Sequence, residues 1–208
     1  KVDVAKGGMF GWAAFEDFDG QYNPFSIVDN EYMKLTTTYR PDYSRDDYWG
    51  QKVTTGYLSS MAQDGGGFHT KGGTNQYFEA RIFCGPNPGL WPAFWTLTAN
   101  GYAQNPDPGQ SDELDILEGY MGTPSGYQIA WHQWDYDTGL GGGANPNLET
   151  EAFSHINLAM GFHTFAVLIT QQTTHYYCDN IEVASHKTLP NSWEDGNYFI
   201  INAALSDH

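Results

Sequence analysis

The chain has 208 residues, with 9 Lys and Arg against 25 Asp and Glu, which gives a formal net charge of −16. This length suits a single domain with a sizeable core. The negative charge argues against nucleic acids and anionic membranes as partners. The sequence has no apolar run of about 18 residues or more, so no transmembrane helix is expected.

Most of the chain consists of short runs with strand-like patterning, separated by turns rich in Gly and Pro. Residues 1–24 are expected to form short strands and turns, and residues 25–38 a hairpin that turns at Asp29-Asn30. Further strands are expected at 54–61, 76–83, 90–97, 127–135, 162–170, 174–178, 181–184 and 198–203.

No segment shows a helical hydrophobic period, and loops are expected at 100–111 and 138–147. Many short strands without helices predict an all-β fold, a sandwich or jelly roll. The chain starts with Lys1 rather than Met, which indicates a processed or trimmed start. Cys84 and Cys178 either form one bridge or remain as buried thiols.

Residues 112–119 alternate acidic and aliphatic side chains, which is the period of a half-buried strand. Glu113 and Asp115 project from one face of this strand, and leucines project from the other. Glu118 comes one residue too late for the acidic face, and a single β-bulge after Asp115 would return it there. Three carboxylates in a row repel one another unless they share protons, which indicates a catalytic role for them.

Paired carboxylates of this kind suit the hydrolysis of glycosides. A retaining glycosidase uses one carboxylate as nucleophile and one carboxylic acid as proton donor, about 5–5.5 Å apart. Glu113 and Glu118 would lie roughly 13 Å apart along the backbone, and two Glu side chains on a curved sheet could close most of that gap. Asp115 between them would push their pKa values apart. The alternative is a solvated acidic strand, since runs of charge usually face water.

The order of motifs along the chain resembles glycoside hydrolase family 16. The signature E-x-D-x-x-E of that family corresponds to residues 113–118, and QYFEARIF, GLWPAFWTL and AWHQWD surround it in the family's order. The resemblance implies a β-jelly-roll of two curved antiparallel sheets, similar to legume lectins and concanavalin A. It implies one catalytic domain over residues 1–208. Family members usually continue beyond the position of His208, so either the chain is trimmed there too or other segments complete the sandwich.

The resemblance also implies site residues and an activity, the endo-hydrolysis of a β-linked polysaccharide with retention of configuration. By position, Glu113 matches the nucleophile, Asp115 the assisting carboxylate and Glu118 the acid/base. Sugar-binding residues are expected at Trp91, Trp95, His132 and Asn202. The two tryptophans share one strand face, where each either stacks on sugar or packs in the core.

His132 is expected to hydrogen-bond to the catalytic carboxylates, although a lone His is more often structural. No cofactor is expected for catalysis. A structural calcium ion is common in the family, but the sequence does not identify its ligands.

The spacing of the signature matches the bulged branch of the family, which includes laminarinases, agarases, porphyranases and carrageenases. With 9 basic residues, 7 Trp and 14 Tyr, the chain suits a neutral polysaccharide better than a sulfated one. We therefore expect a secreted, monomeric endo-hydrolase of β-1,3- or β-1,3-1,4-glucan. The alternatives are a hydrolase of red-algal galactan (agarose, porphyran or carrageenan) and a non-catalytic, lectin-like carbohydrate-binding domain. A polysaccharide lyase is a less favoured alternative, because such an enzyme would need more basic residues than this chain has.

Overall fold

The computed structural model describes residues 11–44, 50–62, 64–99, 110–135, 150–152 and 156–206. The elements in this part of the chain are β1 (Ala14–Glu16), β2 (Phe25–Val28), β3 (Tyr32–Leu35), β4 (Thr38–Tyr39), β5 (Val53–Ser59), β6 (Gln76–Ile82), β7 (Leu90–Thr98), β8 (Gln110–Glu118), β9 (Tyr127–Asp135), β10 (Thr150–Ala152), β11 (His163–Ile169), β12 (Thr173–Cys178), β13 (Ile181–Lys187), α1 (Pro190–Glu194) and β14 (Asn197–Leu205).

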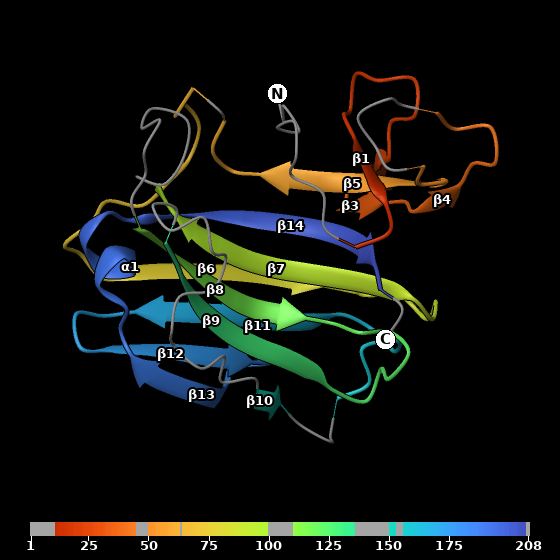
Figure 1. The fold of residues 1–208 in the computed structure, drawn as a ribbon. Coiled ribbons are helices and arrows are strands. Elements are labelled where there is room, and N and C mark those ends of the chain that lie inside the picture. Colours follow the sequence, from red (N-terminus) through yellow and green to blue (C-terminus); the bar gives the residue numbers. More distant parts are fainter. Residues whose placement is uncertain are drawn as a thin grey trace.

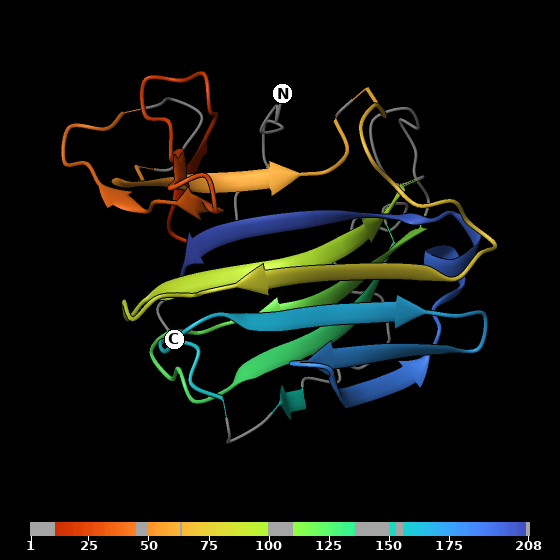
Figure 2. The same ribbon diagram turned by 180° about the vertical axis from the view of Figure 1, so that it is seen from behind.

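The described strands form two large sheets and one small one (Figure 1). The eight-stranded sheet has the order β1-β5-β14-β7-β8-β9-β10, and β4 also pairs with β5. The four-stranded sheet has the order β13-β12-β11-β6, and Figure 2 shows it in front of the larger sheet. The β2-β3 hairpin forms the third sheet.

The hydrophobic core lies between the two large sheets. Leu114, Ile116 and Leu117 of β8 belong to the same core cluster as Phe165 and Val167 of β11, and all five are at most 1% exposed. Each such side chain stabilises the fold by about 1.5–3 kcal/mol relative to an exposed one. The all-β sandwich predicted from the sequence is confirmed.

The structure contains two hairpins, and the first lies where the sequence predicts it. The β2-β3 hairpin turns at Asp29 and Asn30, whose φ angles are 53° and 57°. Asp and Asn tolerate this left-handed conformation because their short side chains bond locally to the backbone. β11 and β12 pair in the antiparallel register expected for a hairpin. The predicted loops lie largely outside the described residues, except that Gln110 and Ser111 belong to β8 rather than to a loop.

One short helix contradicts the prediction that no segment is helical. It is α1, a single turn that begins with Pro190. Proline suits this first position because its missing N–H would have no partner there. One turn is too short to show a hydrophobic period, which explains the miss. Within the described residues, no helix has the length and apolar character needed to span a membrane.

Cys84 and Cys178 are both free thiols that lie buried in the main core cluster. Burial raises the pKa of Cys84 to about 12 and that of Cys178 to about 11. The sequence left open whether the two cysteines form a bridge or remain as buried thiols, and the structure shows buried thiols. A protonated, buried thiol is a poor nucleophile.

Candidate active site

The acidic stretch lies on β8, which pairs with β7 on one side and with β9 on the other. The register between β8 and β9 shifts between Asp115 and Glu118. Within this shift, Ile116 and Leu117 both belong to the hydrophobic core. The extra residue is therefore absorbed on the core side of the strand. This is the β-bulge that the spacing of the acids predicts.

The bulge places the three acids on one face of the sheet, called here the acidic face. Along the ladder between β7 and β8, the acids pair with every second residue of β7: Glu113 with Leu97, Asp115 with Trp95 and Glu118 with Ala93. Alternate residues of a strand share a face, so their partners do too. Since the aliphatic residues of β8 pack toward the four-stranded sheet, the acidic face points away from it.

His132 of β9 lies next to two of the acids. Its Nε2 atom is 3.1 Å from Asp115 Oδ2 and 3.9 Å from Glu113 Oε1. Trp134, two residues along the same strand, donates its Nε1–H to Glu113 Oε2 at 3.0 Å. The His132 and Trp134 rings are stacked at 5.3 Å between centroids, with 22° between their planes. The predicted contact between His132 and the acids is present in the structure.

The electrostatics of this cluster favour protonation of its carboxyls. Burial raises the pKa of Glu113 well above its ordinary value, and the charge of Asp115 raises it further, while His132 and the Trp134 hydrogen bond oppose the shift. Burial also raises the pKa of Asp115 well above its ordinary value, and Glu118 adds to this effect. Glu113 and Asp115 therefore favour keeping a proton at pH values where isolated carboxyls have lost theirs.

Glu118 lies beside an aromatic pair. The Tyr120 hydroxyl donates to Glu118 Oε1 at 3.4 Å, and the Tyr120 ring stacks on Trp91 with 5.4 Å between centroids and 23° between planes. Trp91 therefore stacks on a residue that contacts the acid, and this residue is a tyrosine that the sequence did not indicate. Tyr120 lies beyond the end of β8, where strand alternation predicts no direction for a side chain.

Trp95 and Asn202 form a second pair on the acidic face. Trp95 donates its Nε1–H to Asn202 Oδ1 at 2.8 Å, and Asn202 is 2% exposed. Trp95 also packs against the buried cluster of Met61, Tyr198 and Ile200, so the packing alternative holds for it at least in part. The Nδ2 amide of Asn202 is buried without a hydrogen-bond partner in the described part of the chain.

Asp112, directly before Glu113, lies on the opposite face and is fully buried. Its carboxylate accepts hydrogen bonds from the Ser192 backbone N–H at 2.7 Å and from Gln133 Nε2 at 3.3 Å. Burial raises its pKa, and these donors partly counter the rise. Asp112 therefore ties β8 to α1 and to the strand of His132.

Glu113, Asp115 and His132 each present one possible metal-ligand atom within 4.8 Å of the others, and among the described residues this is the group found with that geometry. The three side chains already contact one another or Trp134. The expected calcium ion is a different, structural one, and its presence stays a prediction.

The comparisons with known proteins agree with this geometry. A family model for glycosyl hydrolases family 16 matches residues 17–201. The chain belongs to glycosyl hydrolase family 16. The matched region contains the acid cluster and three of the four predicted sugar-binding residues, Trp91, Trp95 and His132, and it ends one residue before Asn202.

Among curated relatives, the endo-1,3-1,4-beta-glycanase ExsH of Rhizobium meliloti (strain 1021) is 30% identical over 186 residues, which are 88% of this chain and 34% of that protein. The chain therefore spans about a third of that relative's length.

Two solved structures show the same fold. SCLam, a non-specific endo-β-1,3(4)-glucanase, superposes with a TM-score of 0.68 at 19% identity, over 99% of this chain and 73% of SCLam. Porphyranase B from Zobellia galactanivorans superposes with a TM-score of 0.70 at 15% identity, over 96% of this chain and 72% of that protein. At these identities the likeness establishes the family 16 jelly roll alone.

Proposed function

We propose that this family 16 chain is a retaining endo-glycosidase in which Glu113 is the nucleophile and Glu118 the acid/base. The observation that carries the proposal is the bulge of β8, which returns Glu118 to the face of Glu113 and Asp115. An acidic strand that served only solubility would not need this register shift. It would also not hold Asp115 at 5% exposure, where a carboxylate is costly.

The proposed reaction has two displacements. In the first, a Glu113 oxygen attacks the anomeric carbon, the glycosidic C–O bond breaks, and Glu118 gives its proton to the departing oxygen. In the second, water attacks the same carbon, Glu118 takes a proton from that water, and Glu113 leaves. The two inversions give net retention of configuration.

The groups around Glu113 support its role as the nucleophile, which must be ionised. Trp134 donates a hydrogen bond to Glu113, and His132 lies close to it, and both oppose the rise of its pKa. Asp115 is the more deeply buried carboxyl and hydrogen-bonds with His132. A proton held on Asp115 would remove the charge that most directly repels an ionised Glu113.

For the substrate, we propose a neutral β-1,3- or β-1,3-1,4-glucan. The described residues within hydrogen-bond or ion-pair distance of Glu113 and Asp115 are His132 and Trp134, and neither is the Arg or Lys that sulfate groups usually require. The net charge of −16 also disfavours a polyanion. The named activities of the glycanase and glucanase relatives support the same choice.

The test is an assay with laminarin, mixed-linkage glucan, agarose, porphyran and carrageenan at equal mass, in which new reducing ends are followed. We expect cleavage of the first two, and none by a Glu113→Gln variant that retains the wild-type melting temperature. Cleavage confined to the galactans would overturn the substrate and keep the catalytic roles. Binding of glucan without any cleavage would favour the lectin-like alternative.

A further inference from the structure

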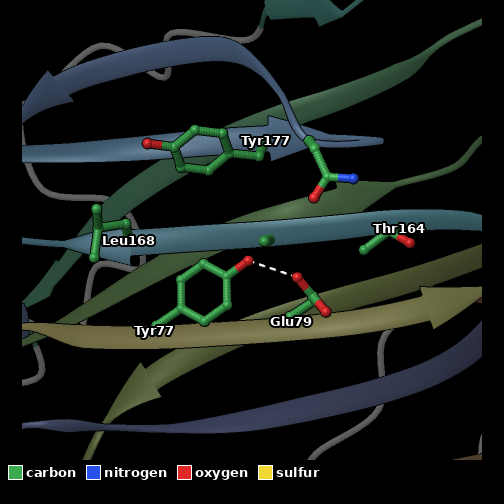
Figure 3. A pocket seen from close by; sticks show the side chains of 7 residues that line it. Tyr77, Glu79, Thr164, Leu168 and Tyr177 are labelled. Atoms are coloured by element: carbon green, nitrogen blue, oxygen red, sulfur yellow. Dashed lines mark hydrogen bonds between the residues drawn. The ribbon is translucent and has the colours of Figure 1, made fainter.

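A hollow lies on the outer face of the four-stranded sheet, which we define as the face turned away from the core. It measures about 230 Å³ and is lined by Tyr77, Glu79, Thr164, Ala166, Leu168, Tyr177 and Asn180. Figure 3 shows Tyr77 and Tyr177 on opposite sides of β11. None of these residues belongs to the acidic face, since their strands form the other sheet.

The hollow results from small residues on the middle strand. Ala166 of β11 pairs with Glu79 of β6 on one side and with Tyr177 of β12 on the other. Its methyl group leaves the space between these larger neighbours unfilled. Because strands in a sheet lie about 4.8 Å apart, the two flanking strands stand roughly 10 Å from each other. The result is a groove with an aromatic ring on each side.

The side chains of the groove combine flat apolar surfaces with hydrogen-bonding groups. Tyr77 is 53% exposed, and its hydroxyl donates to Glu79 Oε2 at 2.6 Å, which fixes both side chains (Figure 3). This hydrogen bond, together with burial, raises the pKa of Tyr77 to about 12, so the phenol stays neutral. Thr164 and Asn180 add polar groups to the lining.

These features select one kind of ligand. Glu79 is the one charged residue among those lining the hollow, so an anion would be repelled, and a lone carboxylate is a poor cation site. The hollow is smaller than the roughly 300–1,000 Å³ of a typical small-molecule site, so it suits a short part of a larger molecule. Tyr rings beside hydroxyl, amide and carboxylate groups complement a neutral sugar, which has apolar ring faces and hydroxyl edges.

We propose that the outer face of the four-stranded sheet is a second glycan-binding site, in which Tyr77 and Tyr177 stack against a neutral polysaccharide chain. The proposal rests on the proposed function in one respect: it takes the ligand to be the same class of polymer as the substrate. The two sites lie on opposite sides of the sandwich, so the outer site would hold a neighbouring chain of an insoluble glucan. Such a tether raises the effective concentration of the enzyme at the polymer without touching the chemistry.

The test uses the Glu113→Gln variant as the parent, so that bound polymer is not consumed. Binding to insoluble β-1,3-glucan is measured for this parent, for the parent with Tyr77→Ala and Tyr177→Ala, and for the parent with Tyr39→Ala. Tyr39 is a matched control, because it is a tyrosine with 69% exposure on β4 of the other large sheet. We expect the double change to weaken binding about tenfold, equivalent to about 1.4 kcal/mol, and the control to have no effect.

The same pair of tyrosine changes is then made in the active enzyme. Hydrolysis of a short soluble oligosaccharide should be unchanged, while hydrolysis of the insoluble polymer should fall about tenfold. If the double variant melts at a lower temperature than its parent, Tyr77→Ala alone supplies the readout, with an expected loss of about threefold. Polymer binding and polymer hydrolysis that are equal in parent and variant would overturn the second site.

These outcomes separate the two proposals. If the wild type cleaves glucan and the tyrosine changes have no effect, the proposed function stands and the second site is wrong. If the wild type cleaves no polysaccharide but binds insoluble glucan in a manner that depends on Tyr77 and Tyr177, the second site stands and the proposed function is wrong. A tyrosine-dependent loss of self-association, with no change in glucan binding, would instead identify the face as a contact between copies of the chain.

Discussion

On each side of the sandwich, a carboxylate accepts a hydrogen bond from an aromatic side chain. On the acidic face Trp134 donates to Glu113 at 3.0 Å, and on the outer face Tyr77 donates to Glu79 at 2.6 Å. At the acidic face the carboxyl has the displaced pKa, and burial is the first cause. At the outer face the tyrosine has the displaced pKa, and its bond to Glu79 is the first cause.

The comparison shows that a hydrogen bond from an aromatic donor does not by itself prepare an acid for catalysis. Glu79 is exposed to water. Glu113 is partly withdrawn from water and faces two further acids, so its ionised form depends on the few donors that reach it. The outer pair is suited to holding a ligand, and the inner cluster to exchanging protons.

The largest expected effect separates the two glutamates directly. Glu113→Ala should lower kcat on glucan by at least about 10³-fold, because the covalent step loses its nucleophile. Azide or formate should restore part of the activity and give a product of inverted configuration. Glu79→Ala is the matched control, and its kcat on a soluble oligosaccharide should equal that of the wild type. Near-normal turnover by Glu113→Ala would show that another group is the nucleophile.

Glu118→Ala should have the next largest effect, and its size should depend on the substrate. Loss of a general acid typically costs about 10²–10⁴-fold when the leaving group needs a proton. A substrate whose leaving group is a good anion, such as a dinitrophenyl glycoside, needs none and should lose far less. Rates on a series of aryl glycosides provide the measurement. The same loss across the whole series would count against Glu118 as the acid.

Residues 113–118 show how far alternation along a strand predicts a site. The faces of Glu113 and Asp115 follow from the period of two, and the bulge follows from the need to return Glu118 to them while the aliphatic residues stay buried. The same reasoning applied to β9 would have placed Trp134 beside Glu113, since it stands two residues from His132. Where one face of a strand must be apolar, the alternation of side chains is therefore sufficient to predict which residues share the other face.

Other parts of the site depend on contacts between distant segments, which alternation does not describe. The packing of Trp95 depends on Met61, and the burial of Asp112 depends on Ser192, 80 residues later. Tyr120 follows the end of β8, so its stacking on Trp91 has no periodic signal. The outer hollow depends on Ala166 lying between Glu79 and Tyr177, which requires the register of three strands.

A smaller effect is expected from the two aromatic donors. Trp134→Phe keeps a ring beside His132 but removes the hydrogen bond to Glu113, and a bond to a charged group contributes about 1.5–3 kcal/mol. We expect kcat/KM to fall about tenfold or more. Since this bond favours the ionised form, its loss should raise the pKa of Glu113 and move the acidic limb of the pH profile to higher pH. Tyr77→Phe removes the corresponding bond at Glu79 and should leave the profile of a soluble substrate unchanged.

The smallest expected effect is on the melting temperature. Removing the charge of Asp115 should raise it, whereas removing the charge of Asp179 should lower it. The pKa of Asp115 is raised by burial and by Glu118, so the folded protein holds a proton that the unfolded chain releases. Its contribution to stability is therefore present at low pH and is lost as the pH rises from about 4, the ordinary carboxyl value, toward the raised value. Asp179 differs: burial raises its pKa, but hydrogen bonds with His163 and Thr164 outweigh burial, so that the net pKa is lowered.

Asp115→Asn should therefore raise the melting temperature relative to the wild type above about pH 4, by roughly 2–4 °C for each kcal/mol of relieved repulsion, and the difference should grow with pH. Asp179→Asn should lower the melting temperature at neutral pH, and this difference should vanish in acid, because a lowered pKa stabilises only above the unfolded value. Melting curves of the three proteins between pH 3 and pH 8 supply the measurement. A loss of stability in Asp115→Asn that developed as the pH rose above about 4 would mean that the Asp115 carboxylate stabilises the fold. In that case the acidic face would not be the strained, proton-sharing cluster that distinguishes it from the outer face.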